Sequence, residues 1–349
     1  MKKNLLIVFI IFAFFLSSCV RQSSDFASKD LNLNSTNKQL EKNDSARISL
    51  KIGIMPYSSY APFYFGKVEG YFLDQGLSAE LIEFSNQPDL LVALASGQID
   101  VSGGILDIGT LTAINEDTGI KIVADKGYIK SNSDCNYVAW MARQNLFDID
   151  SQADSTNLQG KKFVSVNASY YEYVLEKLLN TFNLKTTDIE IVEMPTPARM
   201  EALQTNAIDI AAIGEPWITR TVNSQSGVIW QPFENIVPNA QFGVVWFGPN
   251  ITKDNPELGN RFMTAYLKSV KQYQEGKTDR NVALLSEFTK SSKDEASQTC
   301  WQSFSEDGYV NVDTILDFQN WAFEKGYIDQ KLNLNMLWDD QYLKNANNN

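Results

Sequence analysis

Alternating apolar and polar positions predict strands in the first part of the chain. Residues alternate in this way at 48–54 and 78–84, and 120–124 form a short apolar run. Between these runs, apolar residues recur at helical spacing behind Pro88 and again from Ile105 to Glu116. Strands that alternate with helices predict an α/β fold built on a mostly parallel sheet.

One helix–turn–strand pattern occurs twice. Residues 88–104 predict a helix that ends at Gly97 and a strand that leads to two glycines. Residues 197–217 repeat this order, with Asn206 in the place of Gly97, an offset of 109 residues (206 − 97). The repeat predicts two similar lobes. The alternative is a chance similarity between two short helix–strand units.

Two short apolar runs, Tyr137–Met141 and Gly243–Phe247, flank the segment 142–242. We interpret them as crossing strands between the lobes. Residues 142–242 are then lobe 2, while 48–141 and 243–349 are two parts of lobe 1. Helical periodicity in the second part predicts helices at 256–273, 282–289 and 312–325.

The N-terminus has the pattern of a targeting segment. Lys2 and Lys3 precede an apolar stretch too short to span a bilayer, and residues 16–19 resemble the bacterial lipobox. This resemblance implies a signal peptide over 1–18 and a lipidated Cys19 that anchors the protein. The alternative is a secretory leader with a chance cysteine. Residues 19–47 are polar and predict a flexible tether.

Composition narrows the possible functions. The 349-residue chain has a net charge of −12 and no histidine. No basic run is present to bind nucleic acid. Without histidine, the commonest general base and the usual zinc and iron ligand sets are excluded. We therefore expect no catalytic residues, no metal and no cofactor.

Several motifs resemble the solute-binding proteins of ABC importers. The resemblance is to the branch of these proteins that includes nitrate, sulfonate, taurine, riboflavin and thiamine-pyrimidine binders. It extends, with gaps, from Ile48 to Ala346. The motifs are Ala61–Tyr64, Glu69–Phe72, Ala93–Val101, Ile120–Ala124 and Leu158–Phe163. The resemblance implies a two-lobed type 2 periplasmic-binding-protein fold, each lobe a mostly parallel sheet flanked by helices, with two crossing strands as the hinge. It also implies an extracytoplasmic monomer that binds a small solute by hinge closure and delivers it to permease subunits.

Loops at the carboxyl ends of strands are the expected ligand site. Four loops qualify, at 57–63, 102–105, 167–171 and 214–217, together with one tryptophan on a crossing strand. The ligand-binding residues expected from them are Tyr57, Ser58, Tyr60, Phe63, Gly103, Gly104, Ile105, Asn167, Ala168, Ser169, Tyr171, Glu215, Trp217 and Trp246.

Each of these residues also has a purely structural interpretation. The aromatic side chains could stack on a flat ring or pack in a core. Gly103 and Gly104 could leave backbone N–H groups open to a ligand. Asn167 or Ser169 could cap a helix or contact a ligand.

The chemistry of the four loops favours a heteroaromatic solute, such as a thiamine pyrimidine precursor or riboflavin. Glu215 could accept hydrogen bonds from an amino-pyrimidine, or it could be a surface charge. The four loops contain no lysine or arginine, which disfavours the alternative of a sulfonate, taurine or nitrate.

Two further alternatives concern function. A pyrimidine-synthase enzyme shares this fold, but its family relies on histidine and a cysteine-rich motif, both missing from this sequence. A sensor that presents its solute to a membrane partner is also compatible with the sequence. Cys135 and Cys300 could form a disulfide or remain as two buried thiols.

Overall fold

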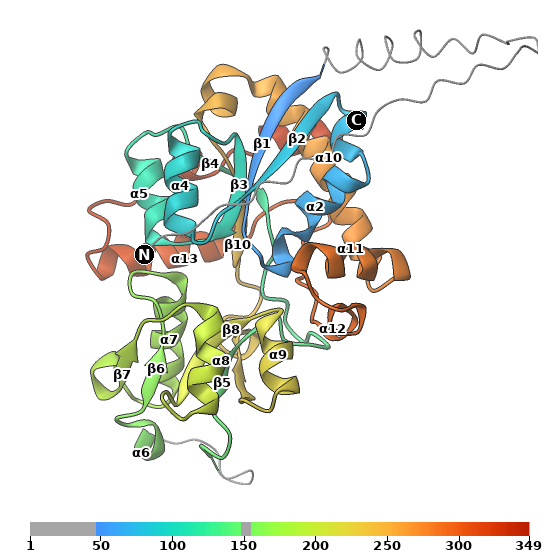
Figure 1. The fold of residues 1–349 in the computed structure, drawn as a ribbon. Coiled ribbons are helices and arrows are strands. Elements are labelled where there is room, and N and C mark those ends of the chain that lie inside the picture. The colour runs from blue at the N-terminus through green and yellow to red at the C-terminus, as the bar shows by residue number, and fades with distance from the viewer. Residues whose placement is uncertain (1–46, 148–154, 349) are drawn as a thin grey trace, which may run out of the picture. The chain divides into compact units, whose positions relative to one another are not determined.

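The computed structural model describes residues 47–147 and 155–348. The predicted signal peptide, the predicted lipidation site Cys19 and the predicted tether before Arg47 lie outside the described residues. Ten strands form two five-stranded sheets in the described part of the chain (Figure 1). We call each sheet with its helices a lobe. Among the described residues, no helix combines the length and the apolar character needed to cross a membrane.

Lobe 1 contains the sheet with the strand order β2-β1-β3-β10-β4. Its strands are β1 (Ile48–Ile54), β2 (Leu77–Glu83), β3 (Val101–Ile105), β4 (Lys121–Asp125) and β10 (Gly243–Phe247). Lobe 2 has the order β7-β6-β8-β5-β9. Its strands are β5 (Val138–Ala142), β6 (Lys162–Val164), β7 (Glu190–Val192), β8 (Ile210–Gly214) and β9 (Val228–Pro232).

The two sheets have the same topology. In lobe 1, β1 is parallel to β2 and β3, and β10 runs antiparallel to β3 and β4. In lobe 2, β6 is parallel to β7 and β8, and β5 runs antiparallel to β8 and β9. Each sheet thus has one antiparallel member, the fourth strand in its order. The predicted α/β fold with mostly parallel sheets is confirmed.

The helix–turn–strand repeat occupies equivalent positions in the two lobes. Gly97 and Asn206 both take left-handed backbone conformations, with φ of 72° and 58°. Asp100 accepts a hydrogen bond from the backbone N–H of Lys51 at 2.7 Å, and Asp209 accepts one from that of Lys162 at 3.0 Å. An equivalent aspartate, directly before the third strand in the order of each sheet, therefore bonds to the second strand, which favours a true repeat over chance similarity.

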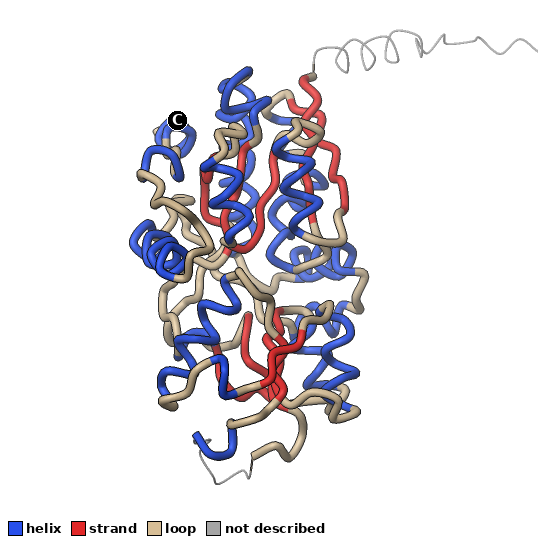
Figure 2. Tube along the Cα trace, turned by 90° about the vertical axis from the view of Figure 1, so that its left-hand side faces the viewer, coloured by secondary structure: helices blue, strands red, loops and turns tan. Residues whose placement is uncertain are grey.

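The predicted crossing strands are the antiparallel members of the two sheets. β10 lies in the sheet of lobe 1 and β5 lies in that of lobe 2, and both are buried along their whole length. The chain itself passes between the lobes in the segments 126–137 and 233–242, which precede these strands. Figure 2 shows loops between the two sheets.

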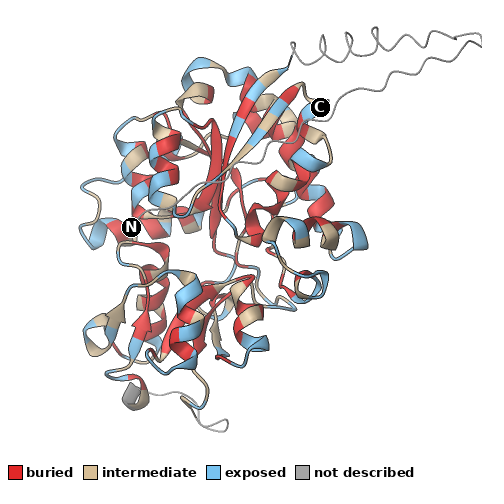
Figure 3. Cartoon of the chain, viewed as in Figure 1, coloured by how far each residue is buried: buried red, intermediate tan, exposed pale blue. Residues whose placement is uncertain are grey.

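The helices surround both sheets. In chain order they are η1 (Ser58–Tyr60), α2 (Ala61–Val68), α3 (Tyr71–Asp74), α4 (Gln87–Ala95), α5 (Ile108–Asn115), α6 (Ser155–Leu158), α7 (Tyr170–Thr181), η2 (Thr186–Asp188), α8 (Thr196–Gln204), α9 (Trp217–Asn223), η3 (Phe233–Asn235), η4 (Asn250–Asp254), α10 (Pro256–Gln274), α11 (Asp279–Thr289), α12 (Lys293–Gln298), α13 (Val312–Glu324), α14 (Leu334–Leu337) and α15 (Gln341–Asn347). The helices predicted at 256–273, 282–289 and 312–325 correspond to α10, α11 and α13. In Figure 3 the buried residues concentrate in the strands and on the helix faces that cover them.

Several predicted elements differ from the structure by one to three residues at an end, and two glycine-rich or capped positions show the local cause. The helix expected at 105–116 begins at Ile108, because β3 continues to Ile105 and Asp107 caps the helix by accepting from the Thr110 N–H. Gly70, whose φ of 79° is left-handed, separates α2 from α3.

Candidate functional site

Four tyrosines gather where the two lobes meet. Tyr57 and Tyr60 belong to the η1 region of lobe 1, Tyr137 immediately precedes β5, and Tyr171 lies in the first turn of α7. The phenols of Tyr57 and Tyr137 lie close enough to Tyr60 and Tyr171 to help raise the pKa of each of these two. Burial is the larger cause, and it raises the pKa of Tyr137 to about 12. We call these four residues the tyrosine cluster.

A buried lysine lies against this cluster. Lys126 follows β4 and is only 4% exposed. Its ammonium lies 3.7 Å from the centre of the Tyr60 ring and donates a hydrogen bond to the Ser59 hydroxyl at 2.9 Å. Lys126 forms no ion pair with a carboxylate in residues 47–147 and 155–348. Burial lowers the pKa of Lys126 to about 7, and the charge of nearby Asp125 partly opposes this shift.

A buried arginine approaches the cluster from lobe 2. Arg199 lies on α8, is 4% exposed, and donates to the carbonyl oxygens of Met194 at 3.1 Å and Ala212 at 2.5 Å. Burial lowers the pKa of its guanidinium, and the nearby phenols of Tyr171 and Tyr57 oppose that shift. In the described part of the chain, Arg199 likewise has no carboxylate partner. Two buried cations without counter-ions thus approach one group of phenols from opposite lobes.

The lobes touch directly on both sides of this region. Asp107 and Ser169 form an isolated antiparallel bridge between the start of α5 and the start of α7. The Ser58 hydroxyl, which is fully buried, donates to the carbonyl oxygen of Glu215 at 3.5 Å. The loops of residues 57–63, 102–107, 167–171 and 214–217 are therefore close together, at the edges that the sequence analysis selected.

Several predicted site residues have structural roles at this edge. Ser169 is the N-cap of α7, and its hydroxyl accepts from the backbone N–H groups of Tyr171 and Glu172. The N–H groups of Asn167 and Ala168 donate to the carboxylates of Glu193 and Glu172. The capping interpretation therefore accounts for the hydrogen bonds of Ser169 and Ala168.

The two glycines do not present an open backbone. Gly103 and Gly104 lie within β3 and pair with β10. A Cβ at Gly103 would lie 2.4 Å from Cδ of Lys126, and one at Gly104 would lie 2.4 Å from Cη2 of Trp246. These glycines make room for side chains. The N–H of Ile105 donates to Gln87 at 2.9 Å, so it also has a protein partner.

Three of the predicted aromatic residues pack in hydrophobic cores. Phe63 is 1% exposed and contacts the rings of Phe262 and Tyr266. Trp246 is fully buried in β10. Trp217 packs against the core of lobe 2, with the Arg220 guanidinium 4.7 Å from its ring. Tyr57, Tyr60 and Tyr171 are the expected aromatics that the structure places together.

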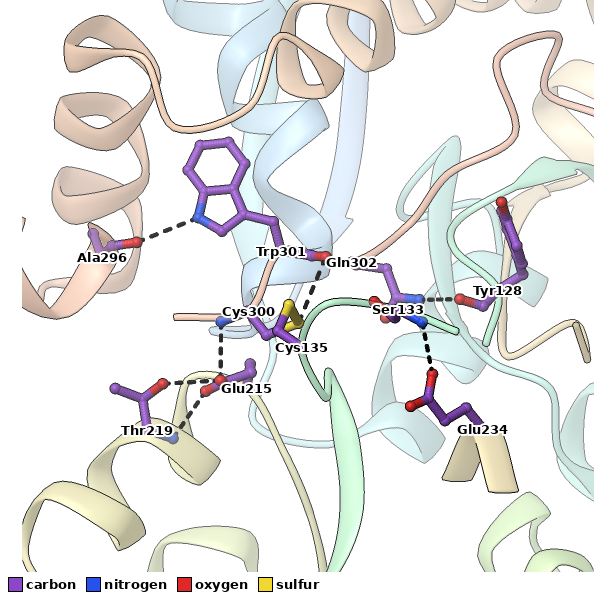
Figure 4. The surroundings of a disulfide bond; sticks show 10 residues. All are labelled: Tyr128, Ser133, Cys135, Glu215, Thr219, Glu234, Ala296, Cys300, Trp301 and Gln302. Carbon is purple, nitrogen blue, oxygen red and sulfur yellow. Dashed lines mark hydrogen bonds between the residues drawn. A yellow bond between two sulfur atoms is a disulfide. The ribbon is translucent and has the colours of Figure 1, made fainter. Parts of the chain in front are cut away.

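Glu215 has protein partners where a ligand was expected. Its carboxylate accepts from the Thr219 hydroxyl at 2.8 Å, the Thr219 N–H at 3.1 Å and the Cys300 N–H at 3.0 Å (Figure 4). The side chain is 2% exposed, and its burial raises the pKa of the carboxyl group. With three donors on two oxygens, Glu215 connects α9 of lobe 2 to the chain at Cys300.

Cys135 and Cys300 form a disulfide bond. Figure 4 shows the bond beside Glu215, between the segment that leads to β5 and the chain that follows α12. Of the two alternatives left open by the sequence, the structure therefore contains the bridge.

A cavity of about 720 Å³ lies elsewhere, near the segment 126–137. Its wall includes Tyr128, Gln241, Trp301 and Tyr309, and no member of the tyrosine cluster. Within residues 47–147 and 155–348, no group of three or more acidic or cysteine side chains could hold a metal ion. The converging cations and phenols remain the stronger candidate for a binding site.

The sequence analysis missed three residues of this site. Lys126 and Tyr137 lie in the segment 126–137, which the four selected loops do not include, and Arg199 lies within a predicted helix. A lysine that directly follows an apolar strand was a usable signal for Lys126. Nothing in the sequence pattern indicates the direction of the Arg199 side chain.

Solved structures with this fold include several solute-binding proteins. A ligand-binding component of an ABC-type import system from Staphylococcus aureus is 19% identical, with a TM-score of 0.70 over 86% of this chain and 99% of that one. The nitrate-binding protein of Synechocystis is 15% identical, with a TM-score of 0.71 over 86% and 89%. The aliphatic sulphonate-binding protein of Escherichia coli is 16% identical, with a TM-score of 0.66 over 84% and 92%.

The fold is also shared by an enzyme. The desulfurization enzyme DSZB is 11% identical to this chain and has a TM-score of 0.59. No curated protein sequence matches the chain. The sequence profile of the NMT1-like family matches residues 43–286, which is more than half of the chain. The protein therefore belongs to the NMT1-like family.

Proposed function

We propose that this protein is the solute-binding component of an ABC importer and that it captures a small organic or inorganic anion between its lobes. The observation that carries the proposal is the pair of buried cations without counter-ions, Lys126 and Arg199, one from each lobe. Isolated buried charges are costly, and an anion placed between them would offset that cost.

The two cations suit an oxyanion in different ways. The Lys126 ammonium has three N–H donors and gives one to Ser59, so two remain. The guanidinium of Arg199 can present a flat pair of donors to a sulfonate or nitrate. The phenols of Tyr57 and Tyr171 lie close to Arg199 and can donate further hydrogen bonds. Because both lobes contribute, such an anion would stabilise the closed arrangement by its differential affinity.

A heteroaromatic solute fits this site less well. Its expected acceptor, Glu215, already has three protein donors. The four selected loops contain no lysine or arginine, and this lack disfavoured an anionic solute. Lys126 and Arg199 reach the site from outside those loops, so the objection no longer holds. The nitrate- and sulfonate-binding proteins that share the fold agree with the anionic alternative.

The proposal includes a location and a role. An importer component of this kind would be extracytoplasmic and monomeric, with Cys19 as its lipid anchor and permease subunits as its partners. The two lobes that close on the solute would be joined by the segments 126–137 and 233–242, so the first boundary lies before β5 and not at residue 141 as expected from the sequence. We propose binding and not catalysis, in line with the solute-binding proteins that share the fold.

Thermal unfolding with a panel of solutes tests the proposal. Nitrate, methanesulfonate, taurine, riboflavin and a thiamine pyrimidine would each be added to the purified protein. We expect an anion to raise the melting temperature, since a ligand at about 100 times its Kd contributes about 2.7 kcal/mol of stability. Lys126→Met and Arg199→Met should each remove most of the shift.

The exposed Lys67 provides a matched control. Lys67→Met should keep the full shift. A shift with riboflavin or the pyrimidine alone would favour the heteroaromatic alternative, and anion binding that survives both site variants would show that the cations are not the site.

A further inference from the structure

Lys126 is buried in surroundings that suit a neutral amine. Its side chain runs over Gly103, and a Cβ at that glycine would lie 2.7 Å from the Val244 carbonyl oxygen, so the passage is narrow. The ammonium contacts one hydroxyl and one aromatic face. Neither carries the full negative charge that a buried ammonium needs.

We propose that, above neutral pH, capture of the anion is coupled to the uptake of one proton by Lys126, so that the neutral amine becomes a full ammonium when the anion occupies the site. This inference rests on the proposed function. The proton comes from solvent and binds the lone pair of Nζ, and no bond in the solute changes.

The groups that face Lys126 do not change their charge near neutral pH. The Lys126 amine is therefore the group that gains a proton when the anion binds. From η1 come Ser59 and the phenol of Tyr60, which burial keeps protonated because its pKa is raised well above 10. Tyr57, Tyr137 and Asp107 surround Tyr60. The strands β3 and β10 contribute Gly103 and Val244, which do not titrate.

Asp125 is the nearest carboxylate, and it is directed to other partners. One of its oxygens accepts from the Gly127 N–H at 2.8 Å and from Gln241 Nε2 at 2.6 Å. The other accepts from the Ser305 N–H at 2.8 Å. Burial raises the pKa of Asp125 to about 7. Its titration could also change the anion affinity between pH 6 and pH 8, so the experiment must separate it from Lys126.

The pKa of Lys126, lowered to about 7 by burial, gives the direction of the effect. Below pH 7 the lysine is charged in the empty protein, and anion affinity should not depend on pH. Above pH 7 the empty protein has lost the proton, and binding must restore it. The affinity should then fall about tenfold for each pH unit.

Isothermal titration calorimetry with methanesulfonate and nitrate measures the coupling. Neither anion titrates in this pH range. In buffers of different ionisation enthalpy at pH 8.5, we expect an uptake approaching one proton per anion, and almost none at pH 6. Lys126→Arg, whose charge is permanent, should bind with an affinity that is flat between pH 7 and pH 9. A pH dependence that persists in this variant would assign the proton to Asp125 and overturn the inference.

A second measurement does not depend on the folding of the arginine variant. NMR of protein labelled at lysine Cε reports each amine directly, and the signal missing from Lys126→Met identifies Lys126. Its titration midpoint should rise by more than two pH units when methanesulfonate is added, and an unchanged midpoint would contradict the coupling. If neither anion binds at pH 6, the proposed function itself fails. If both bind equally well at pH 6 and pH 9, only the coupling fails.

Discussion

Two cationic side chains are buried without a carboxylate partner in the described part of the chain. Lys126 and Arg199 are each 4% exposed, and both have pKa values lowered by burial. Buried charges of this kind destabilise a fold unless something else compensates them. Their retention here is best explained by a ligand that supplies the negative charge, so these residues reduce stability in the empty protein and increase affinity.

Replacing Lys126 with methionine should therefore stabilise the ligand-free protein. The folded pKa of about 7 lies below the unfolded value of 10.5, so unfolding takes up a proton above pH 7 and the wild type gains stability as pH rises towards 10.5. The gain in stability of Lys126→Met over the wild type should be largest at pH 6 and smaller at pH 8.5. At pH 6 we expect the melting temperature of the variant to be higher by about 3 °C or more.

Thermal unfolding followed by circular dichroism at both pH values checks this prediction. Lys67→Met is the control and should show no pH-dependent difference from the wild type. A Lys126→Met protein that is less stable than the wild type at both pH values would mean that the contacts of Lys126 with Ser59 and Tyr60 outweigh its burial cost.

At the scale of the elements, α13 links the C-terminal part of the chain to lobe 2. Its residues Phe318 and Trp321 contact the rings of Tyr170 and Tyr173 on α7. Glu176 on α7 accepts from Trp321 Nε1 at 2.7 Å and pairs with Lys325 Nζ at 2.5 Å. The N-terminus of the same helix α7 lies at the site, so α13 helps to hold the site half that belongs to lobe 2.

Removing this link should weaken anion binding without changing the site. In Glu176→Gln the charge that pairs with Lys325 is lost. Because this pair is partly exposed, we expect a two- to fivefold increase in Kd, corresponding to at most about 1 kcal/mol. Calorimetry with methanesulfonate at pH 6 measures the change. Asp74→Asn, which breaks the surface pair with Lys268 within lobe 1, is the matched control and should bind normally. Equal affinities in both variants would show that α13 does not support the site.

At the scale of the whole folded unit, the disulfide joins distant parts of the chain. Cys135 lies in the segment that passes from lobe 1 to lobe 2, and Cys300 lies 165 residues later. The Cys300 N–H donates to Glu215 of lobe 2, so the bridge and this hydrogen bond hold the same junction. A cross-link over so long a loop restricts the unfolded chain strongly.

The double variant Cys135→Ala/Cys300→Ala should accordingly lose stability. The loop-entropy relation gives an upper value of about 5 kcal/mol for this separation, and native disulfides typically contribute about 2–5 kcal/mol. Denaturant unfolding of the variant and of the oxidised wild type measures the difference. Peptide mapping without reductant provides the check on the bond itself. Free alkylation of both cysteines in the native protein would show that the bridge does not form.

Sequence patterns predicted the elements best where burial is continuous. The strand at 48–54 and the run at Gly243–Phe247 match β1 and β10 in both bounds, because their apolar residues repeat without interruption. The 109-residue repeat also predicted equivalent units around Gly97 and Asn206. The boundary at Ile105 was wrong because small residues, Gly103 and Gly104, continue β3 where glycine usually indicates a turn.

The amino-acid sequence by itself determined the α/β class, the two similar lobes and the tyrosines at 57, 60 and 171, since these follow from local periodicity and from the order of strands. Only the tertiary structure decided the charge of the site. Lys126 reaches it across Gly103 of β3, which lies two strands away in the sheet, and Arg199 reaches it from a helix of the other lobe. Glu215 is occupied by donors at Thr219 and Cys300. The physical reason is that the direction and partners of a long side chain depend on packing between segments far apart in the chain, which local sequence patterns do not encode.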